Sequence, residues 1–335
     1  MQDKASGPQQ DARQDDLECV LLGAPCELDR DEVSAAAGVP ELEARALWNA
    51  LGFPVVAPGE KAFTQRDVQA LKSAMALRQG GLVDDDTLLV LARSMGQGLA
   101  RMAEAHVDVF RELATDMTLD EATATALLSA EEVLPRLEEL VVHVWRRQFA
   151  AATGRAFAAA TRDGRPEVAV GFVDIVDFTA STRTWDSATL ERLLERFERE
   201  TALRVTAFGG RVVKTLGDEV MYVTDDAVSA VEVALDTVAA HCADDDLPDV
   251  RAGVAIGPVL ERLGDVFGQP VNLASRLVDE ARPRSVLVDV MVAEGLERQG
   301  MVDGSYVLKR LRRRSVRGYR ALTPYLLRRV DDDGD

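Results

Sequence analysis

The sequence predicts an α+β protein in two parts: an all-helical N-terminal domain, and a C-terminal domain in which strands and helices alternate. Its 335 residues exceed what one ordinary hydrophobic core holds. From residue 84 to 160, apolar residues recur at spacings of three and four, as on one face of an α-helix. Beyond residue 166, short apolar segments typical of strands alternate with helical ones. These observations predict the two-domain division.

The N-terminal domain begins with helix signals. Residues 29–49 form a capped helical pattern broken at Gly38, and Thr64 with Asp67 three residues later marks a second helix start. Such a helix-turn-helix-like pattern is also found in DNA-binding proteins. Acidic residues surround it, however, and phosphate contacts depend on a cationic surface. We therefore expect no nucleic-acid partner.

Further helical stretches follow at residues 88–102, 119–128 and 131–147. Their Leu and Met stripes are typical of a packed core or a dimer interface. We place the helical domain over residues 19–160, after a polar tail, residues 1–18, whose composition predicts disorder. The Gly- and Arg-containing segment 154–166 is expected to connect it to the C-terminal domain, residues 161–330.

The C-terminal domain shows alternating element signals. Strands are expected at 168–173, 250–256 and 285–289, a hairpin through Gly217-Asp218, and helices at 190–205, 227–240 and 271–280. Two helices on a mostly antiparallel sheet give an α+β sandwich of the ferredoxin-like type.

Charge and hydropathy exclude several classes of protein. A formal net charge of −18 argues against a general binder of nucleic acid or anionic membranes. The first residues lack the apolar core of a signal peptide, and no apolar run is long enough to cross a bilayer. The three cysteines lack metal-ligand spacing and are interpreted as free thiols. We therefore expect a cytoplasmic protein with no membrane partner.

Three segments carry the chemistry. Residues 172–179 and 214–221 each place an aspartate where an apolar strand meets a turn, and residues 264–276 add an acid, an amide and a guanidinium. Paired carboxylates of this kind can bind hard metal ions that carry a nucleoside triphosphate.

These segments, in this order, resemble the catalytic domain of class III nucleotidyl cyclases, which convert a nucleoside triphosphate to a 3′,5′-cyclic monophosphate and pyrophosphate. The resemblance covers about residues 167–329 and implies a ferredoxin-like class III cyclase domain. It implies two divalent cations, Mg²⁺ or Mn²⁺, bound by Asp174, Asp218 and the carbonyl of Ile175. For Asp174, the alternative is an ordinary strand-end cap.

The resemblance also assigns substrate contacts. Lys214 and Asp265 match the positions that read the base in adenylate cyclases, with lysine donating to adenine N1 and aspartate accepting from the N6 amine, so ATP is the expected substrate. A solvated hairpin lysine is the alternative for Lys214. Amides around Phe178 and Thr179 open a helix and can cradle phosphate oxygens. Asp177 departs from the family, which most often has glycine there. Its carboxylate would repel a triphosphate unless it points away or helps to bind metal.

Asn272 and Arg276 lie four residues apart on one predicted helix face. By resemblance, Asn272 orients the ribose and Arg276 stabilises charge on the α-phosphoryl oxygens. A helix-surface role is the alternative for Arg276. Family members also place a cation against the β- and γ-phosphates, and Arg317 or Arg320 can fill that role. The alternative there is a solvated cationic edge strand.

Members of the family build each site between two catalytic domains, with metal ligands from one and base-reading and transition-state residues from the other. Because this chain carries both sets, the resemblance implies a homodimer with two equivalent sites. Three alternatives remain: a diguanylate cyclase, which lacks the Asn272/Arg276 helix and has a doubled glycine; a catalytically silent nucleotide-binding or dimerisation module; and a transcription regulator.

The helical N-terminal domain resembles the autoinhibitory, pH-sensing module of some bacterial adenylate cyclases. Histidine is the natural titrating group between pH 5 and 8. Of the three histidines, His143 lies in the helix that leads to the catalytic domain and is the candidate sensor. The alternative is an ordinary packed or surface histidine.

Overall fold

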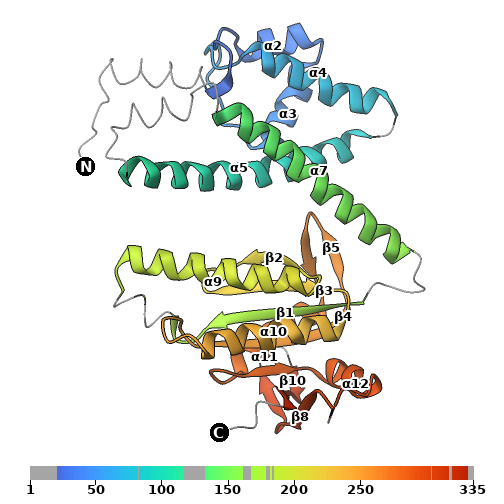
Figure 1. Cartoon of the computed structure of the whole chain (residues 1–335). Coiled ribbons are helices and arrows are strands. Elements are labelled where there is room, and N and C mark those ends of the chain that lie inside the picture. Colours follow the sequence, from blue (N-terminus) through green and yellow to red (C-terminus); the bar gives the residue numbers. More distant parts are fainter. Residues whose placement is uncertain are drawn as a thin grey trace. The chain divides into compact units, whose positions relative to one another are not determined.

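The computed structural model describes residues 21–81, 83–116, 133–160, 167–178, 182, 185–302, 304–316 and 319–330. It divides into two compact units, Met1–Thr153 and Gly154–Asp335, which we describe separately (Figure 1). The predicted disordered tail, residues 1–18, and the predicted helical stretch 119–128 lie outside the described residues.

The described part of the N-terminal unit is helical. Its helices are α2 (Arg30–Ala37), α3 (Glu41–Leu51), α4 (Gln65–Gln79), α5 (Asp85–Asp116) and α7 (Val133–Ala160). Both predicted start signals are confirmed, because Asp29 with Glu32 and Thr64 with Asp67 form reciprocal capping boxes. Gly38 ends α2 in the left-handed conformation with φ of 69°, and buried Leu47, Trp48 and Leu71 lie in the core.

Helix α7 ends at Ala160, the last residue of the stretch whose pattern predicts helix, and so overlaps the predicted connection 154–166. Residues 154–160, expected to belong to a connection, form its last two turns. A helix-interior glycine costs only about 1 kcal/mol relative to alanine, and the alanine-rich run after Gly154 outweighs it. Among the helices of the described ranges, none combines the length and apolar character needed to cross a bilayer. The cytoplasmic location stays a prediction.

The C-terminal unit is built on a seven-stranded sheet with the order β2-β3-β1-β4-β7-β11-β8. Its strands are β1 (Glu167–Ile175), β2 (Arg211–Thr215), β3 (Glu219–Thr224), β4 (Val250–Pro258), β7 (Val286–Val288), β8 (Tyr306–Arg310) and β11 (Tyr325–Arg329). The β4–β7 pair is parallel and the other pairs are antiparallel, so the predicted mostly antiparallel sheet is confirmed. Two small ribbons accompany it, β5 (Leu260–Arg262) with β6 (Asp265–Phe267), and β9 (Arg314–Val316) with β10 (Tyr319–Leu322).

Helices cover both faces of this sheet (Figure 1). On one face, α9 (Ser187–Ala207), α10 (Ala227–Cys242) and α12 (Val290–Arg298) pack on the β1 side chains Ala169, Val173 and Ile175. On the other, α11 (Gln269–Glu280) packs on Val170 and Phe172. The α+β class is as predicted. The division of the helices between the two faces, the β5–β6 hairpin and α12 were not predicted.

Helix α11 approaches the sheet closely at Gly253. A Cβ at that position would lie 2.4 Å from the backbone nitrogen of Val278 and 2.5 Å from the carbonyl oxygen of Ala274. Glycine is therefore required for α11 to lie on β4, and this approach fixes the height of Asn272 and Arg276 above the sheet.

Candidate active site

A row of three charged residues crosses the sheet at the end of β1. Asp174 lies directly opposite Glu219 of β3 and Arg251 of β4. Because side chains alternate along a strand, the Asp174 side chain lies on the same face as Val170 and Phe172, which is the face that α11 covers. Arg251 donates to Asp174 Oδ2 from Nε at 2.7 Å, and its Nη2 lies 2.6 Å from the same oxygen.

The second predicted metal ligand lies beside the first. Asp218 sits in the turn between β2 and β3, and its carbonyl accepts from the Ile175 amide at 3.1 Å. The preceding Gly217 has φ of 70°, a left-handed conformation that suits glycine in this tight turn. The strand-end positions of Asp174, Ile175 and Asp218 are thus brought together by main-chain bonding.

Electrostatics at this cluster are dominated by carboxylates. Burial raises the pKa of Asp174, and Asp218 and Asp279 add to the rise, whereas Arg251 opposes it. Burial together with the charges of Asp174, Asp279 and Asp218 raises the pKa of Glu219 to about 7. A site that penalises negative charge in this way suits an added cation.

Oxygen donors of this kind fit a hard divalent cation. Both Arg251 contacts fall on Oδ2 of Asp174, so Oδ1 can face a cation together with Asp218 and the Ile175 carbonyl. Within the described ranges, no three His, Cys, Asp or Glu side chains converge as a metal cage.

The turn after β1 places residue 177 in a conformation that suits glycine. Asp177 adopts φ of 56°, a left-handed conformation that aspartate tolerates better than most residues. Its side chain is exposed. Phe178 packs partly buried against the core, and its carbonyl accepts from the Thr182 amide at 2.9 Å, as in a helical turn. Thr179 lies outside the described residues.

The predicted base-reading pair also meets in the structure. Lys214 of β2 donates from Nζ to both carboxylate oxygens of Asp265 on β6, at 2.9 and 2.7 Å. The two residues are 51 positions apart, and the β5–β6 hairpin brings them together. Although burial opposes it, Lys214 lowers the pKa of Asp265, with help from the Val266 amide. The contact therefore favours the charged form of Asp265, and each side chain of the pair is about one-third exposed.

Helix α11 carries the two remaining candidates. Pro270 near its start and the apolar residues Ala274, Leu277 and Val278 fix its buried face. Asn272 is exposed and Arg276 is partly exposed, so both are accessible to a ligand. The guanidinium of Arg276 donates from Nη1 to Asp279 Oδ2 at 2.9 Å.

The structure places the C-terminal basic segment only in part. Arg317 lies outside the described residues, and for Arg320 only the backbone on β10 is described. Lys309 and Arg310 are exposed on β8, at the edge of the sheet. The triphosphate role of Arg317 or Arg320 stays a prediction.

Sequence reasoning missed Arg251, Glu219 and Asp279. Arg251 is an arginine inside an otherwise apolar strand, and this was the one available signal, because buried charges are usually paired. Its partner Asp174 is 77 residues away, so the pairing itself required the sheet register.

Comparison with known proteins identifies this arrangement. The model of the adenylate and guanylate cyclase catalytic domain matches residues 161–329. An adenylate cyclase of Streptomyces coelicolor is 39% identical, with the match covering 95% of this chain and 90% of that protein. The chain belongs to the class III adenylate and guanylate cyclase family.

Other relatives of this cyclase match both halves of the chain. An adenylate cyclase of Streptomyces griseus is 41% identical over 85% of this chain and 72% of its own length. A pH-sensitive adenylate cyclase of Mycobacterium tuberculosis (strain CDC 1551) is 30% identical over 74% of this chain and 64% of its own. The resemblance found in the motifs is confirmed at the level of the family.

The predicted base-reading residues and the predicted metal ligands have different bonding partners in this structure. Among the described residues, no hydrogen bond or ion pair joins Lys214 or Asp265 to Asp174 or Asp218.

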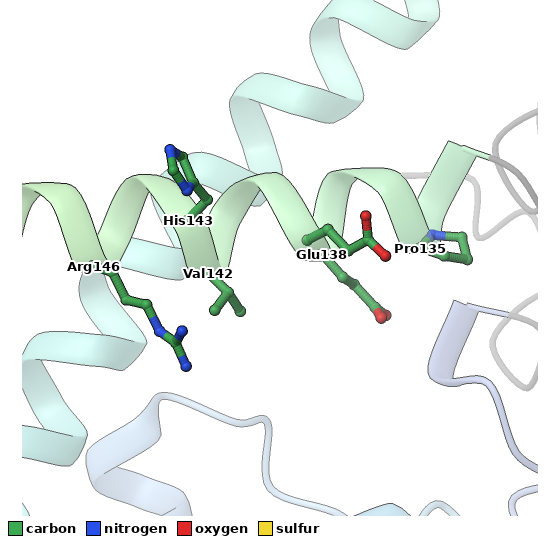
Figure 2. Close-up of a pocket in the computed structure, with 6 residues that line it drawn as sticks. Pro135, Glu138, Val142, His143 and Arg146 are labelled. Carbon is green, nitrogen blue, oxygen red and sulfur yellow. The ribbon is translucent and has the colours of Figure 1, made fainter.

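The candidate sensor of the N-terminal unit lies on α7. His143 is exposed and lines a hollow together with Pro135, Glu138, Glu139, Val142 and Arg146. Figure 2 shows Val142 and Arg146 projecting to one side of the helix and His143 to another. Glu139, one turn before His143, and Arg146 and Arg147, nearly one turn after it, are the charged neighbours on the same helix.

Proposed function

We propose that this protein is an adenylate cyclase that converts ATP to 3′,5′-cyclic AMP and pyrophosphate. The observation that carries the proposal is the Lys214–Asp265 pair, which brings a donor on β2 together with an acceptor on β6. Adenine offers N1 as an acceptor and its N6 amine as a donor, whereas guanine offers the reverse, so the pair matches ATP. The adenylate cyclases among the relatives support the same substrate.

The proposed reaction is attack of the ribose 3′-oxygen on the α-phosphorus with release of pyrophosphate. Two divalent cations, Mg²⁺ or Mn²⁺, would favour loss of the 3′-hydroxyl proton and neutralise the leaving phosphates. Asp174, Asp218 and the Ile175 carbonyl would bind them. The amides at Phe178 and Thr179 would bind phosphate oxygens, Asn272 would orient the ribose, and Arg276 would stabilise charge on the α-phosphoryl group.

Each active site would form between two copies of the chain. Within one chain Lys214 bonds Asp265 and Arg251 bonds Asp174, so the two sets of residues have different partners, which is compatible with this arrangement. One copy would supply the metal ligands, and the other would supply the base-reading pair, Asn272 and Arg276. A homodimer would then hold two equivalent sites.

The second candidate function is a catalytically silent module that binds nucleotide or dimerises. Such a module has no need to keep the catalytic residues. Asp174, Asp218, Lys214, Asp265, Asn272 and Arg276 are all present, and this favours an active enzyme.

We also propose that the N-terminal unit regulates the enzyme through pH. Protonation of His143 would add positive charge beside Arg146 and Arg147 and draw the ring toward Glu139, and α7 would respond by shifting between inhibiting and permissive arrangements. The 30% sequence identity to a pH-sensitive adenylate cyclase, over 74% of this chain, supports this proposal.

Mixing two inactive variants tests the shared site. Asp174→Ala and Arg276→Ala chains should each be inactive alone, because each homodimer lacks one essential group at both sites. Mixed dimers would contain one intact site, so mixing should restore up to about a quarter of the wild-type rate if the chains pair at random. Failure to restore activity, with mixed dimers confirmed by affinity-tag pull-down, would contradict the shared site.

A further inference from the structure

Asp279 contacts the arginines of both sets of site residues. At the C-terminal end of α11, its carboxylate accepts from Nη1 of Arg276 at 2.9 Å. Its backbone carbonyl accepts from Nη1 of Arg251 at 3.1 Å. The same Arg251 holds Asp174 through Nε and Nη2. One residue therefore lies between the proposed transition-state arginine and the metal-binding carboxylate.

Stability alone does not account for an acid at this position. A negative charge in the last turn of a helix opposes the helix dipole. The Asp279 charge also adds to the carboxylate repulsion at Asp174 and Glu219. In return, the ion pair with Arg276 is solvent-exposed, with Asp279 at 55% and Arg276 at 36% of their side-chain surface, and exposed pairs contribute little.

The contact does constrain the Arg276 side chain. A free arginine samples many rotamers, whereas an ion pair at Nη1 restricts them and leaves Nε and Nη2 for a ligand. Arg251 donates to the carbonyl of Asp279, which anchors the end of α11 on the row of charged residues at the end of β1. The position of the Arg276 guanidinium relative to the sheet is therefore set through a single residue, Asp279.

We infer that Asp279 is a positioning residue that orients Arg276 for the cyclisation step. The inference rests on the proposed function. In the proposed homodimer, Arg276 acts in one active site while Asp174 and Arg251 of the same chain belong to the other, so Asp279 also joins the two sites.

Mixed dimers with one working site test this inference. In a dimer of an Asp174→Ala chain and an Arg276→Ala chain, the first supplies Arg276 to the working site and the second supplies Asp174. Asp279→Asn, which keeps the size and the carbonyl but removes the charge, is placed on either chain in turn. The two mixtures then differ only in whether the chain that carries Asp279→Asn supplies Arg276 or Asp174 to the working site.

We expect kcat to be about three- to fivefold lower when Asp279→Asn is on the chain that supplies Arg276 than when it is on the other chain. This factor corresponds to the free energy that an exposed ion pair contributes. KM for ATP should stay within about twofold, because the effect is on the transition state. Equal effects from the two placements, no effect from either, or a larger effect on the Asp174-bearing chain would overturn the inference.

Two controls separate orientation from damage to the fold. Glu297→Gln removes an exposed charge from α12 of the same domain and should leave the rate unchanged. The thermal unfolding midpoint of Asp279→Asn should match that of the parent chain. If the mixture without Asp279→Asn has no activity, the shared site itself is wrong, and the inference falls with it.

Discussion

Replacing Asp265 with alanine tests the base-reading pair directly. Asp265 accepts two hydrogen bonds from Lys214, at 2.9 and 2.7 Å, and in the proposed complex it accepts from the adenine amine. A hydrogen bond to a charged group is worth about 1.5–3 kcal/mol. Its loss should therefore lower kcat/KM for ATP by about 10- to 150-fold.

Stability should change far less than activity. Lys214 and Asp265 are 35% and 32% exposed, and exposed ion pairs contribute at most about 1 kcal/mol. The assay measures kcat/KM for ATP and GTP together with the free energy of unfolding. The preference for ATP over GTP should fall by at least about tenfold in Asp265→Ala, since only ATP loses a bonding partner.

Glu261→Gln provides the matched control on the same hairpin. Glu261 is 55% exposed and pairs with Arg211 at 3.2 Å, so the substitution removes a comparable charge beside the site. The control should retain both rate and nucleotide preference. An unchanged ATP-to-GTP ratio in Asp265→Ala, with normal folding, would refute the assignment of this pair.

Three further predictions concern pH and metal. Buried Asp289 caps α12, and burial raises its pKa to about 7, so the folded chain keeps a proton that the unfolded chain loses above about pH 4. The stability of the wild type should therefore fall between pH 4 and 7. Asp289→Asn, an equally good cap, should reduce the difference in urea-unfolding free energy between pH 5 and 8 by on the order of 3 kcal/mol. An identical pH dependence in both proteins would contradict this. Chelation of the metal by EDTA should abolish turnover. Mn²⁺ with a non-cyclisable ATP analogue should raise the thermal unfolding midpoint of the wild type but not of Asp174→Ala, because bound metal gives the carboxylates at β1 a counter-charge. Equal shifts in both proteins would place the metal elsewhere. His143→Ala should flatten the activity-versus-pH profile of the full-length enzyme, and an unaltered profile would exclude His143 as the sensor.

Local signals in the sequence predicted local structure well. The capping boxes at Asp29 and Thr64 and the turn at Gly217 each depend on residues within three or four positions, and each is found in the structure. The same holds for the placement of Asp174 and Asp218 at strand ends, since a strand followed by a turn is visible in the sequence.

Long-range pairing could not be read in the same way. Arg251 and Asp174 meet only because β1 and β4 pair in one particular register, and a shift by one residue would separate them. How closely α11 approaches the sheet depends on the room left at Gly253. At Gly154, helix propensity over the following residues outweighs the local breaker, so the predicted connection is partly helix.

Cyclic nucleotide formation by the purified full-length protein tests the proposed activity most directly. ATP and GTP are supplied in parallel, with Mg²⁺ or Mn²⁺, from acidic to mildly alkaline pH, and the products are separated by chromatography. We expect cyclic AMP from ATP, little cyclic GMP from GTP, and no product from Asp174→Ala. Cyclic GMP as the main product would contradict the role of Lys214 and Asp265, and no product under any condition would favour the silent module.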